Sequence, residues 1–148
     1  LTVHRRRNIV FIYQFYNLVP VLNVKENIEL PILLDYKKPD KNEKINIIKM
    51  LKLEDRIDNL PSQLSGGQQQ KVAIGRAIIT KPSIILADEP TGNLDTKNSN
   101  EIIDYLKYSC KKFNQTILMV THNLDIALQA DRIIKLEDGK IILDKKNI

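Results

Sequence analysis

Three apolar runs of the chain are each followed by polar side chains that could bind a ligand: Gln14, then Asp88 with Glu89, then His122. Runs of this kind are typical of strands that are buried in a parallel sheet. In open α/β sheets, ligands bind outside the carboxyl ends of the strands. The sequence therefore predicts a site at which an amide, two carboxylates and an imidazole are delivered to one edge of a sheet.

Each of these side chains also has an ordinary structural explanation when it is taken alone. A glutamine after a strand is usually a loop residue, and an Asp-Glu pair often forms a turn or caps a helix. A single histidine is more often a hydrogen-bonded surface residue than a functional one. The occurrence of all of them at equivalent places favours a functional site over three unrelated loops.

The strands that must position these side chains are predicted by apolar, β-branched or aromatic runs: Asn8–Gln14, Ser83–Ala87 and Thr116–Thr121. A β-hairpin that turns at Asp138-Gly139 follows them, because this dipeptide favours a type I′ turn. Helices are predicted between the strands. We therefore expect an α/β fold with a parallel or mostly parallel sheet that is covered on both faces.

Two predicted helical regions separate the strands. Residues 24–60 are mostly helical, and one helix there begins at Asp40, with Glu43 at the capping-box spacing. An apolar stripe follows on that helix: Ile45, Ile47, Ile48 and Leu51. Residues 97–113 are expected to form an amphipathic helix, with apolar residues on one side.

The stretch "QLSGGQQQKVAIGRA", which begins at Gln63, has two glycines at the start of an otherwise good helix. Ser65 and Gln68 have the spacing of a capping box, which explains the helix start but not the glycines. A glycine inside a helix costs about 1 kcal/mol relative to alanine, yet Gly66 and Gly67 occupy the first turn. Without Cβ atoms, the free N–H groups there are open to an anion. We therefore expect phosphate to bind at this helix tip.

Composition and charge argue against a nucleic-acid-binding protein, a membrane-spanning protein and a disulfide-linked protein. The formal net charge is +5, and the basic run His4–Arg7 is compatible with nucleic-acid binding. The lysines are scattered, however, and aromatic and basic residues do not interleave, so we expect no nucleic-acid partner. No apolar run approaches the ~18 residues that span a bilayer. The single cysteine, Cys110, allows no internal disulfide.

Five motifs resemble those of ATP-binding cassette (ABC) ATPases and occur in the family's order. "FIYQ" is similar to the Q-loop, "LSGGQQQKVAIGRA" to the signature motif, "IILADEP" to the Walker B strand with its catalytic glutamate, "GNLD" to the D-loop and "VTH" to the switch histidine. The stretch "QFYNLVPVLNVKENIELP" further resembles the subfamily that powers lipoprotein release, macrolide export and antimicrobial-peptide resistance. The resemblance implies a P-loop NTPase-like fold with an inserted helical subdomain at about 24–60, followed by the signature helix, Walker B, switch histidine and hairpin in 64–148.

The resemblance also implies a role for each site residue. Asp88 would hold Mg²⁺ through its water shell, and Gln14 would touch the Mg²⁺ or the attacking water. Glu89 would orient and deprotonate that water, and His122 would hydrogen-bond the γ-phosphate of ATP. The signature residues would close on the nucleotide held by the opposite subunit of a head-to-tail homodimer: Ser65, Gly66, Gly67 and Gln68. Asp95 would contact that partner across the interface.

One departure from the family concerns the P-loop. The pattern G-x-x-x-x-G-K-[ST] does not occur, and the sole Gly-Lys pair, Gly139-Lys140, precedes Ile141 in the predicted hairpin. We therefore expect residues 1–148 to be the C-terminal part of one nucleotide-binding domain, truncated at its N-terminus. Such an incomplete domain is expected to hydrolyse ATP negligibly on its own.

The resemblance finally implies a membrane partner. The helical middle of the family docks a membrane permease, so the apolar positions of 24–60 are either core or part of a groove for a permease helix. We expect a cytoplasmic protein, peripheral on the inner face of the cell membrane. One alternative is a soluble ABC ATPase of DNA repair or translation, which would carry a long coiled coil or a second cassette. The other is a non-catalytic interaction protein, against which the intact Glu89 and His122 argue.

Overall fold

The computed structural model describes residues 8–147, so the basic run His4–Arg7 lies outside the described residues. Three strands form one parallel sheet in the order β1-β2-β3: β1 (Ile9–Ile12), β2 (Ile84–Asp88) and β3 (Thr116–Val120). Each coincides with a predicted strand apart from its ends. The predicted parallel sheet of an α/β fold is therefore confirmed.

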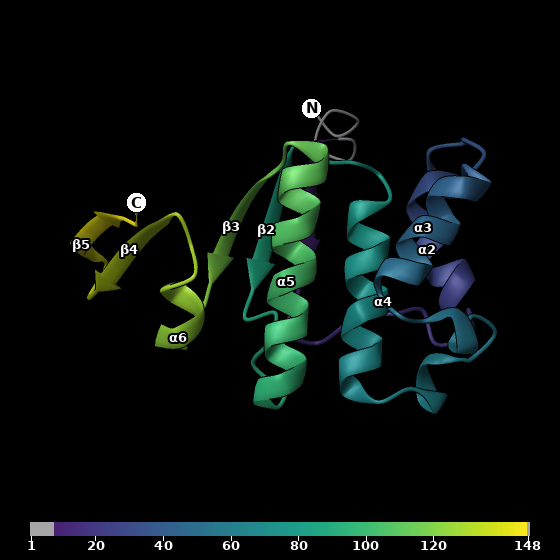
Figure 1. Ribbon diagram of the computed structural model, residues 1–148, viewed down its shortest axis with the longest axis horizontal. Coiled ribbons are helices and arrows are strands. Elements are labelled where there is room, and N and C mark those ends of the chain that lie inside the picture. Colours follow the sequence, from purple (N-terminus) through teal and green to yellow (C-terminus); the bar gives the residue numbers. More distant parts are fainter. Residues whose placement is uncertain (1–7, 148) are drawn as a thin grey trace.

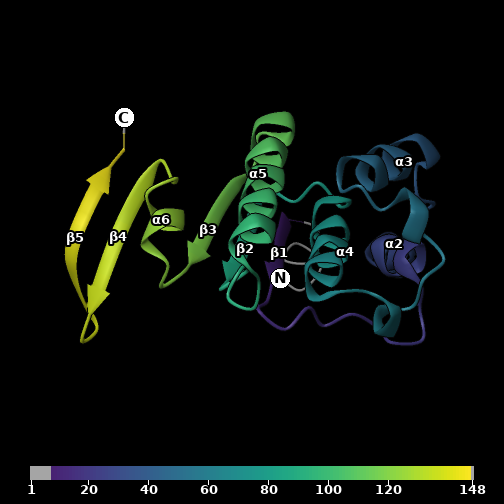
Figure 2. The ribbon, with the colours of Figure 1, turned by 60° about the horizontal axis from the view of Figure 1, so that its bottom comes forward.

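Two helices pack on one face of this sheet: α4 (Gly66–Ile78) and α5 (Thr96–Phe113). Figures 1 and 2 both show them side by side along the strands. The strand residues that face them are buried, among them Ile12 of β1 and Ile85 of β2. In Figure 1 the arrowheads of β2 and β3 and the first turns of both helices lie toward the bottom of the view. Strand ends and helix N-termini thus share one side of the molecule.

The opposite face of the sheet is uncovered within residues 8–147. Successive residues of a strand point to opposite faces, and both α4 and α5 lie on the same one. Phe11 is therefore 46% exposed, Leu118 61% and Val120 60%. The expectation that both faces are covered is wrong for the described residues, and the run Thr116–Thr121 is only half-buried because β3 also lies at the edge of this sheet.

The helical middle predicted at 24–60 consists of two helices and a 3₁₀ turn, and a second 3₁₀ turn leads on to α4: α2 (Val24–Leu34), α3 (Lys41–Met50), η1 (Glu54–Arg56) and η2 (Pro61–Gln63). This region packs closely against α4 at Gly75. A Cβ atom there would lie 2.9 Å from Leu51 Cδ1 and 3.1 Å from Ile28 Cδ1. Helix α4 therefore belongs to the layer on the sheet and also packs against the helical region 24–60.

Helix α3 begins as predicted but differs in two side chains. Asp40 is its N-cap and accepts hydrogen bonds from the main-chain N–H groups of Asn42 and Glu43. The reciprocal half of a capping box is not formed, because the Glu43 carboxylate is paired with Lys81 at 2.8 Å. Ile45, predicted to lie on the apolar stripe, is 45% exposed, whereas the other members of the stripe are buried.

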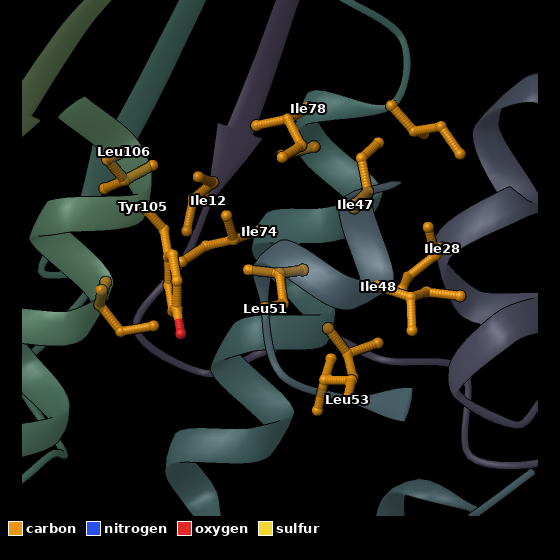
Figure 3. Packing of buried hydrophobic residues seen from close by; sticks show 14 of the residues in the cluster. Ile12, Ile28, Ile47, Ile48, Leu51, Leu53, Ile74, Ile78, Tyr105 and Leu106 are labelled. Carbon is orange, nitrogen blue, oxygen red and sulfur yellow. The ribbon is translucent and has the colours of Figure 1, made fainter. Parts of the chain in front are cut away.

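One hydrophobic core connects the sheet layer with the helical subdomain. Figure 3 shows Ile12 of β1, Ile74 of α4 and Leu106 of α5 at one side of this core, with Leu51 and Ile48 reaching it from the subdomain. Because these side chains form one continuous cluster, α4 is packed against the sheet on one side and against the helical region 24–60 on the other. None of the helices in residues 8–147 has the length and apolar composition that crossing a membrane requires.

A short helix and a hairpin follow β3: α6 (Leu124–Ala127), β4 (Arg132–Glu137) and β5 (Lys140–Lys146). Asp138 and Gly139 at the turn have φ values of 48° and 73°. Positive φ at both central positions is what a type I′ turn requires, so the predicted turn is confirmed. The hairpin forms a separate two-stranded sheet, seen at the far left of Figure 1.

Candidate functional site

Glu89 and His122 meet at the carboxyl ends of β2 and β3. The Glu89 N–H continues the ladder by donating to the Val120 carbonyl at 2.9 Å. Glu89 Oε1 then accepts a hydrogen bond from the main-chain N–H of His122 at 2.9 Å and lies 2.8 Å from His122 Nδ1. The parallel register of the two strands therefore brings together the carboxylate and the imidazole that the sequence predicted for this edge.

The backbone and side chain of Glu89 are both unusual. Its φ is 44°, in the left-handed region that non-glycine residues enter only at a cost of order 1–3 kcal/mol. Its second carboxylate oxygen, Oε2, is buried, and no described residue donates a hydrogen bond to it. An unpaired buried acceptor is also unfavourable. Local strain and an unsatisfied buried oxygen together make Glu89 a candidate functional residue.

Gln14 reaches the same edge from β1 but contacts a loop. Its Nε2 donates to Asn93 Oδ1 at 3.2 Å. A Cβ atom on Gly92 would lie 2.9 Å from Gln14 Nε2 and 3.4 Å from the Glu89 carbonyl oxygen. Gly92 also donates its N–H to that carbonyl at 3.0 Å. The absence of a side chain at Gly92 thus lets Gln14 approach the loop that carries Glu89.

Asp88 is the last residue of β2, and it is exposed beside Glu89. Within residues 8–147, no group of three or more His, Cys, Asp or Glu side chains is arranged to hold a metal ion. Mg²⁺ sites in nucleotide-binding proteins often use one or two carboxylates together with phosphate oxygens and waters. Asp88 fits a site of that kind, in which the nucleotide supplies several of the ligands.

The N-terminus of α4 has the predicted capping box. Ser65 Oγ accepts from the Gln68 N–H at 3.3 Å, and Gln68 Oε1 accepts from the Ser65 N–H at 2.9 Å. Gly66 and Gly67 are the first two helical residues, and no described group accepts a hydrogen bond from their N–H groups. These N–H groups can donate hydrogen bonds to an anion, which the positive end of the helix dipole also favours.

The two glycines of this tip also make room for side chains of the same chain. A Cβ atom on Gly66 would lie 2.6 Å from the Tyr16 hydroxyl oxygen, and one on Gly67 would lie 2.9 Å from Asn98 Oδ1. Close approach at these glycines, which the sequence suggested for a ligand, is made here by Tyr16 and Asn98. Packing therefore contributes to the choice of glycine at both positions.

Asp95 is the N-cap of α5. Its carboxylate accepts from the main-chain N–H of Asn98 at 2.9 Å and from Asn98 Nδ2 at 2.7 Å. These hydrogen bonds, that of the backbone first, lower the pKa of Asp95. Because Asn98 also lies against Gly67, the cap connects Asp95 with the tip of α4. No hydrogen bond or ion pair among residues 8–147 joins that tip to Glu89 or His122.

The order of these features along the chain can be compared with known proteins. Residues 2–92 match the ABC transporter family. The chain belongs to the ABC transporter family. The strand that ends at Asp88, the loop after Glu89 and the capped helix that starts at Gly66 are therefore parts of an ABC ATPase cassette.

Two relatives show how the chain compares with ABC proteins in sequence. It is 43% identical over 152 residues to the uncharacterised ABC transporter ATP-binding protein MJ0796 of Methanocaldococcus jannaschii, with 99% of this chain and 65% of the relative covered. It is 44% identical over 145 residues to the macrolide export ATP-binding/permease protein MacB 2 of Yersinia pestis, with 95% of this chain and 21% of the relative covered. The chain thus spans about two thirds of the first relative.

Two solved structures show the same relationship in space. A dimeric structure of the ATP-binding cassette MJ0796 in a post-hydrolysis state, bound to ADP and Pi, superposes with a TM-score of 0.85 at 40% identity. That match covers 98% of this chain and 65% of the other. A second dimeric structure of the same cassette gives a TM-score of 0.81 at 39% identity. The fold is that of an ABC ATPase cassette.

Sequence reasoning missed several residues that hold the ABC motifs together. Arg76 of α4 donates to the main-chain carbonyls of Asn17 and Tyr16, at 2.7 and 3.0 Å, and so fixes the segment after Gln14. Gln70 of α4 donates to the Pro90 carbonyl, next to Glu89. The available signal was that Gln70 is a polar residue on a helix face that is otherwise buried. That pattern indicates a hydrogen bond but does not identify the group that accepts it.

Proposed function

We propose that the protein is the ATP-binding and ATP-hydrolysing subunit of an ABC transporter that powers a separate membrane permease. The observation that carries this proposal is the geometry of Glu89, whose Oε1 is held by His122 while Oε2 is buried without a partner among the described residues. A carboxylate with one oxygen fixed by hydrogen bonds and the other without a hydrogen-bond donor suits a general base. Membership of the ABC transporter family supports ATP as the substrate.

In the proposed reaction, water attacks the γ-phosphorus of ATP, and the bond from that phosphorus to the bridging oxygen of ADP breaks. Glu89 orients the water and accepts its proton, and ADP leaves with the electron pair of the broken bond. A positioned base of this kind contributes about 10²–10⁴-fold to the rate. The His122 side chain is 79% exposed. Its Nδ1 contacts Glu89, and its Nε2 has no hydrogen-bond partner among the described residues. When both ring nitrogens are protonated, His122 can donate to Glu89 and to the γ-phosphate together.

Asp88 and Gln14 would hold the Mg²⁺ ion of the nucleotide. Both side chains are delivered by parallel strands to the edge that carries Glu89. When bound, Mg²⁺ would neutralise phosphate charge and orient the β- and γ-phosphates. Gln14 also contacts Asn93, so the proposed metal site is continuous with the loop that leads to α5.

The α4 tip would act on a nucleotide held by a second copy of the protein in a head-to-tail homodimer. Among residues 8–147 the tip makes no hydrogen bond to Glu89 or His122 of its own chain, and the N–H groups of Gly66 and Gly67 have no described acceptor. The tip residues would close on the partner's nucleotide: Ser65, Gly66, Gly67 and Gln68. Asp95 would contact the partner across the interface. The dimeric structures of the related cassette support this arrangement.

The permease would be a separate membrane protein that contacts the helical subdomain. Relatives that combine ATP-binding and permease parts for macrolide export support export of a drug, peptide or lipoprotein. The protein would then lie on the inner face of the cell membrane, bound peripherally through the permease. The exposed Leu33 and Leu34 at the end of α2 offer apolar surface for such a contact.

ATP hydrolysis by the complete protein tests the proposal directly. We expect Mg²⁺-dependent release of phosphate that falls at least about 10²-fold in Glu89→Gln. The same variant should retain ATP and form a dimer on size-exclusion chromatography with ATP present. Glu137→Gln is the matched control, because Glu137 is exposed in the hairpin, far along the chain from the strand ends.

Two results would contradict the proposal. Equal rates of ATP hydrolysis by wild type and Glu89→Gln would show that Glu89 is not the general base. A Glu89→Gln protein that stays monomeric at saturating ATP would argue against the head-to-tail homodimer. The 148-residue chain alone should hydrolyse ATP negligibly, since its sequence contains no P-loop motif to cradle the phosphates. Robust turnover by the pure chain would overturn that expectation.

A further inference from the structure

We infer that Gln70 is a positioning residue that holds Glu89 in its strained orientation by binding the Pro90 carbonyl. This inference rests on the proposed function, in which Glu89 is the general base. Gln70 lies on α4, in the second turn of the helix that carries the signature residues, and its side chain is fully buried, with 0% exposure. Its Nε2 donates to the Pro90 carbonyl oxygen at 2.7 Å.

The Pro90 carbonyl is well placed to control Glu89. Proline has no N–H, so the carbonyl is the main-chain group by which Pro90 can be anchored. Glu89 immediately before it has a φ of 44°, a conformation that persists only when neighbouring contacts hold it. Gly92 holds the Glu89 carbonyl from the other side of the turn at 3.0 Å. Without Gln70, the backbone at Glu89 can relax, and the carboxylate moves with it.

The hydrogen bonding of Gln70 argues against a role in stability alone. Its Oε1 is buried and has no hydrogen-bond partner among residues 8–147. Such an unsatisfied oxygen makes glutamine a poor choice for simple packing, because an apolar residue of similar size would avoid the penalty. The donated bond to Pro90 is therefore the feature that glutamine contributes here.

A second buried glutamine provides a matched comparison at the other end of β2. Gln115 Nε2 donates to the Pro82 carbonyl at 2.9 Å, and Gln115 Oε1 accepts from Ser109 Oγ at 2.5 Å. Both amide groups therefore bind a proline carbonyl next to β2, but only Gln70 does so beside Glu89. Gln115→Met removes the equivalent contact to a proline carbonyl, and the Ser109 hydrogen bond with it, without touching the proposed site.

The experiment compares Gln70→Met and Gln115→Met in the complete protein. We expect Gln70→Met to lower kcat at least about tenfold at saturating ATP while KM stays within about twofold, since small displacements of a reacting group cost large factors in rate. Gln115→Met should leave kcat within about twofold of wild type. Both variants should lower the midpoint of thermal unfolding, so that a difference in kcat between them is not explained by a loss of stability alone.

Amide hydrogen exchange supplies a readout that does not depend on activity. The His122 N–H donates to Glu89 Oε1, so its protection reports whether Glu89 is in place. Measured by NMR without nucleotide, this amide should exchange at least about fivefold faster in Gln70→Met and at the wild-type rate in Gln115→Met. Gln70→Asn, which keeps the amide but shortens the reach, is the second variant if Gln70→Met does not fold.

The two readouts separate the inference from the proposed function. Equal His122 exchange in wild type and both Gln70 variants overturns the positioning role, and so does equal loss of kcat in Gln70→Met and Gln115→Met. Faster His122 exchange in the Gln70 variants alone supports the role. If the wild-type protein hydrolyses no ATP, the proposed function fails, and the exchange measurement still decides whether Gln70 holds Glu89.

Discussion

The hydroxyl oxygen of Tyr16 lies 2.6 Å from the point that a Cβ atom of Gly66 would occupy. The next nearest atom, Tyr16 Cζ, is at 3.6 Å, an ordinary contact distance. The first glycine of the signature helix is thus explained at least in part by a single oxygen atom. Two different reasons could therefore require glycine at position 66: room for the Tyr16 hydroxyl and access for a nucleotide.

A double-mutant cycle distinguishes these reasons. Gly66→Ala should lower the free energy of unfolding by about 1–3 kcal/mol, as overpacking does. In the Tyr16→Phe background the hydroxyl is absent, and the same substitution should cost less than about 1 kcal/mol, measured by urea unfolding. Additive losses in the double variant would contradict the packing explanation. If the stable double variant still fails to dimerise with ATP, nucleotide access is an independent requirement.

Arg76→Lys should detach the segment after Gln14 from α4. The guanidinium donates to two carbonyls, those of Asn17 at 2.7 Å and Tyr16 at 3.0 Å, and a compact ammonium cannot reproduce this fork. The side chain is half-buried, and this burial lowers the pKa of Arg76. We expect a loss of about 1.5–3 kcal/mol in unfolding free energy by chemical denaturation. Arg56→Lys, at an exposed arginine in η1, should change stability by less than about 0.5 kcal/mol.

Ser65→Ala should destabilise the N-terminus of α4. Loss of the hydroxyl leaves the Gln68 N–H without its acceptor, and removal of an N-cap costs about 0.5–2 kcal/mol. Ser65→Asp, which can also cap, should restore most of the stability. Ser62→Ala, at an exposed position of the η2 turn, is the control in the same thermal unfolding series. A loss in Ser62→Ala equal to that in Ser65→Ala would show that the cap contributes nothing specific.

The pairing of Glu101 with Lys71 should make stability depend on acid pH. The hydrogen bond from Lys71, at 2.7 Å, lowers the pKa of Glu101 below its usual 4.5. A carboxylate with a depressed pKa stabilises the folded state fully above its unfolded pKa and loses that contribution as pH falls through the folded pKa. The difference in unfolding free energy between wild type and Glu101→Gln should therefore be largest near neutral pH.

The same measurement at acid pH completes the test. Below the usual value of 4.5, the difference between wild type and Glu101→Gln should shrink steadily. Asp104→Asn, at an exposed position on the same helix, is the control for a general effect of charge. A gap between wild type and Glu101→Gln that stays constant from pH 7 to pH 3 would show that the ion pair does not stabilise the fold.

The strands, helix caps and hairpin turn could be predicted from patterns among residues that are close in sequence. The Ser65 capping box, the Asp138-Gly139 turn and the polar residues at strand ends each follow from a few neighbouring residues. The meeting of Glu89 with His122 could also be predicted, since parallel strands place their carboxyl ends at the same edge of the sheet.

The remaining contacts depend on residues that are distant in sequence. Arg76 and Tyr16 are 60 positions apart, and no periodic pattern within α4 indicates that the segment after Gln14 is the partner. The uncovered face of the sheet was missed for a related reason. A continuous apolar run indicates that a strand could be buried on both faces, but not which elements do it.

Glu89 combines a left-handed backbone with a buried oxygen that has no described partner. Both features are unfavourable in the resting protein, so replacement by asparagine or glycine, which tolerate this φ, removes two penalties at once. Random variants selected only for heat resistance should therefore lose the carboxylate at this position early. In the proposed function Glu89 is the general base, so selection that also demands turnover should keep the carboxylate, and durability and catalysis would compete at a single residue.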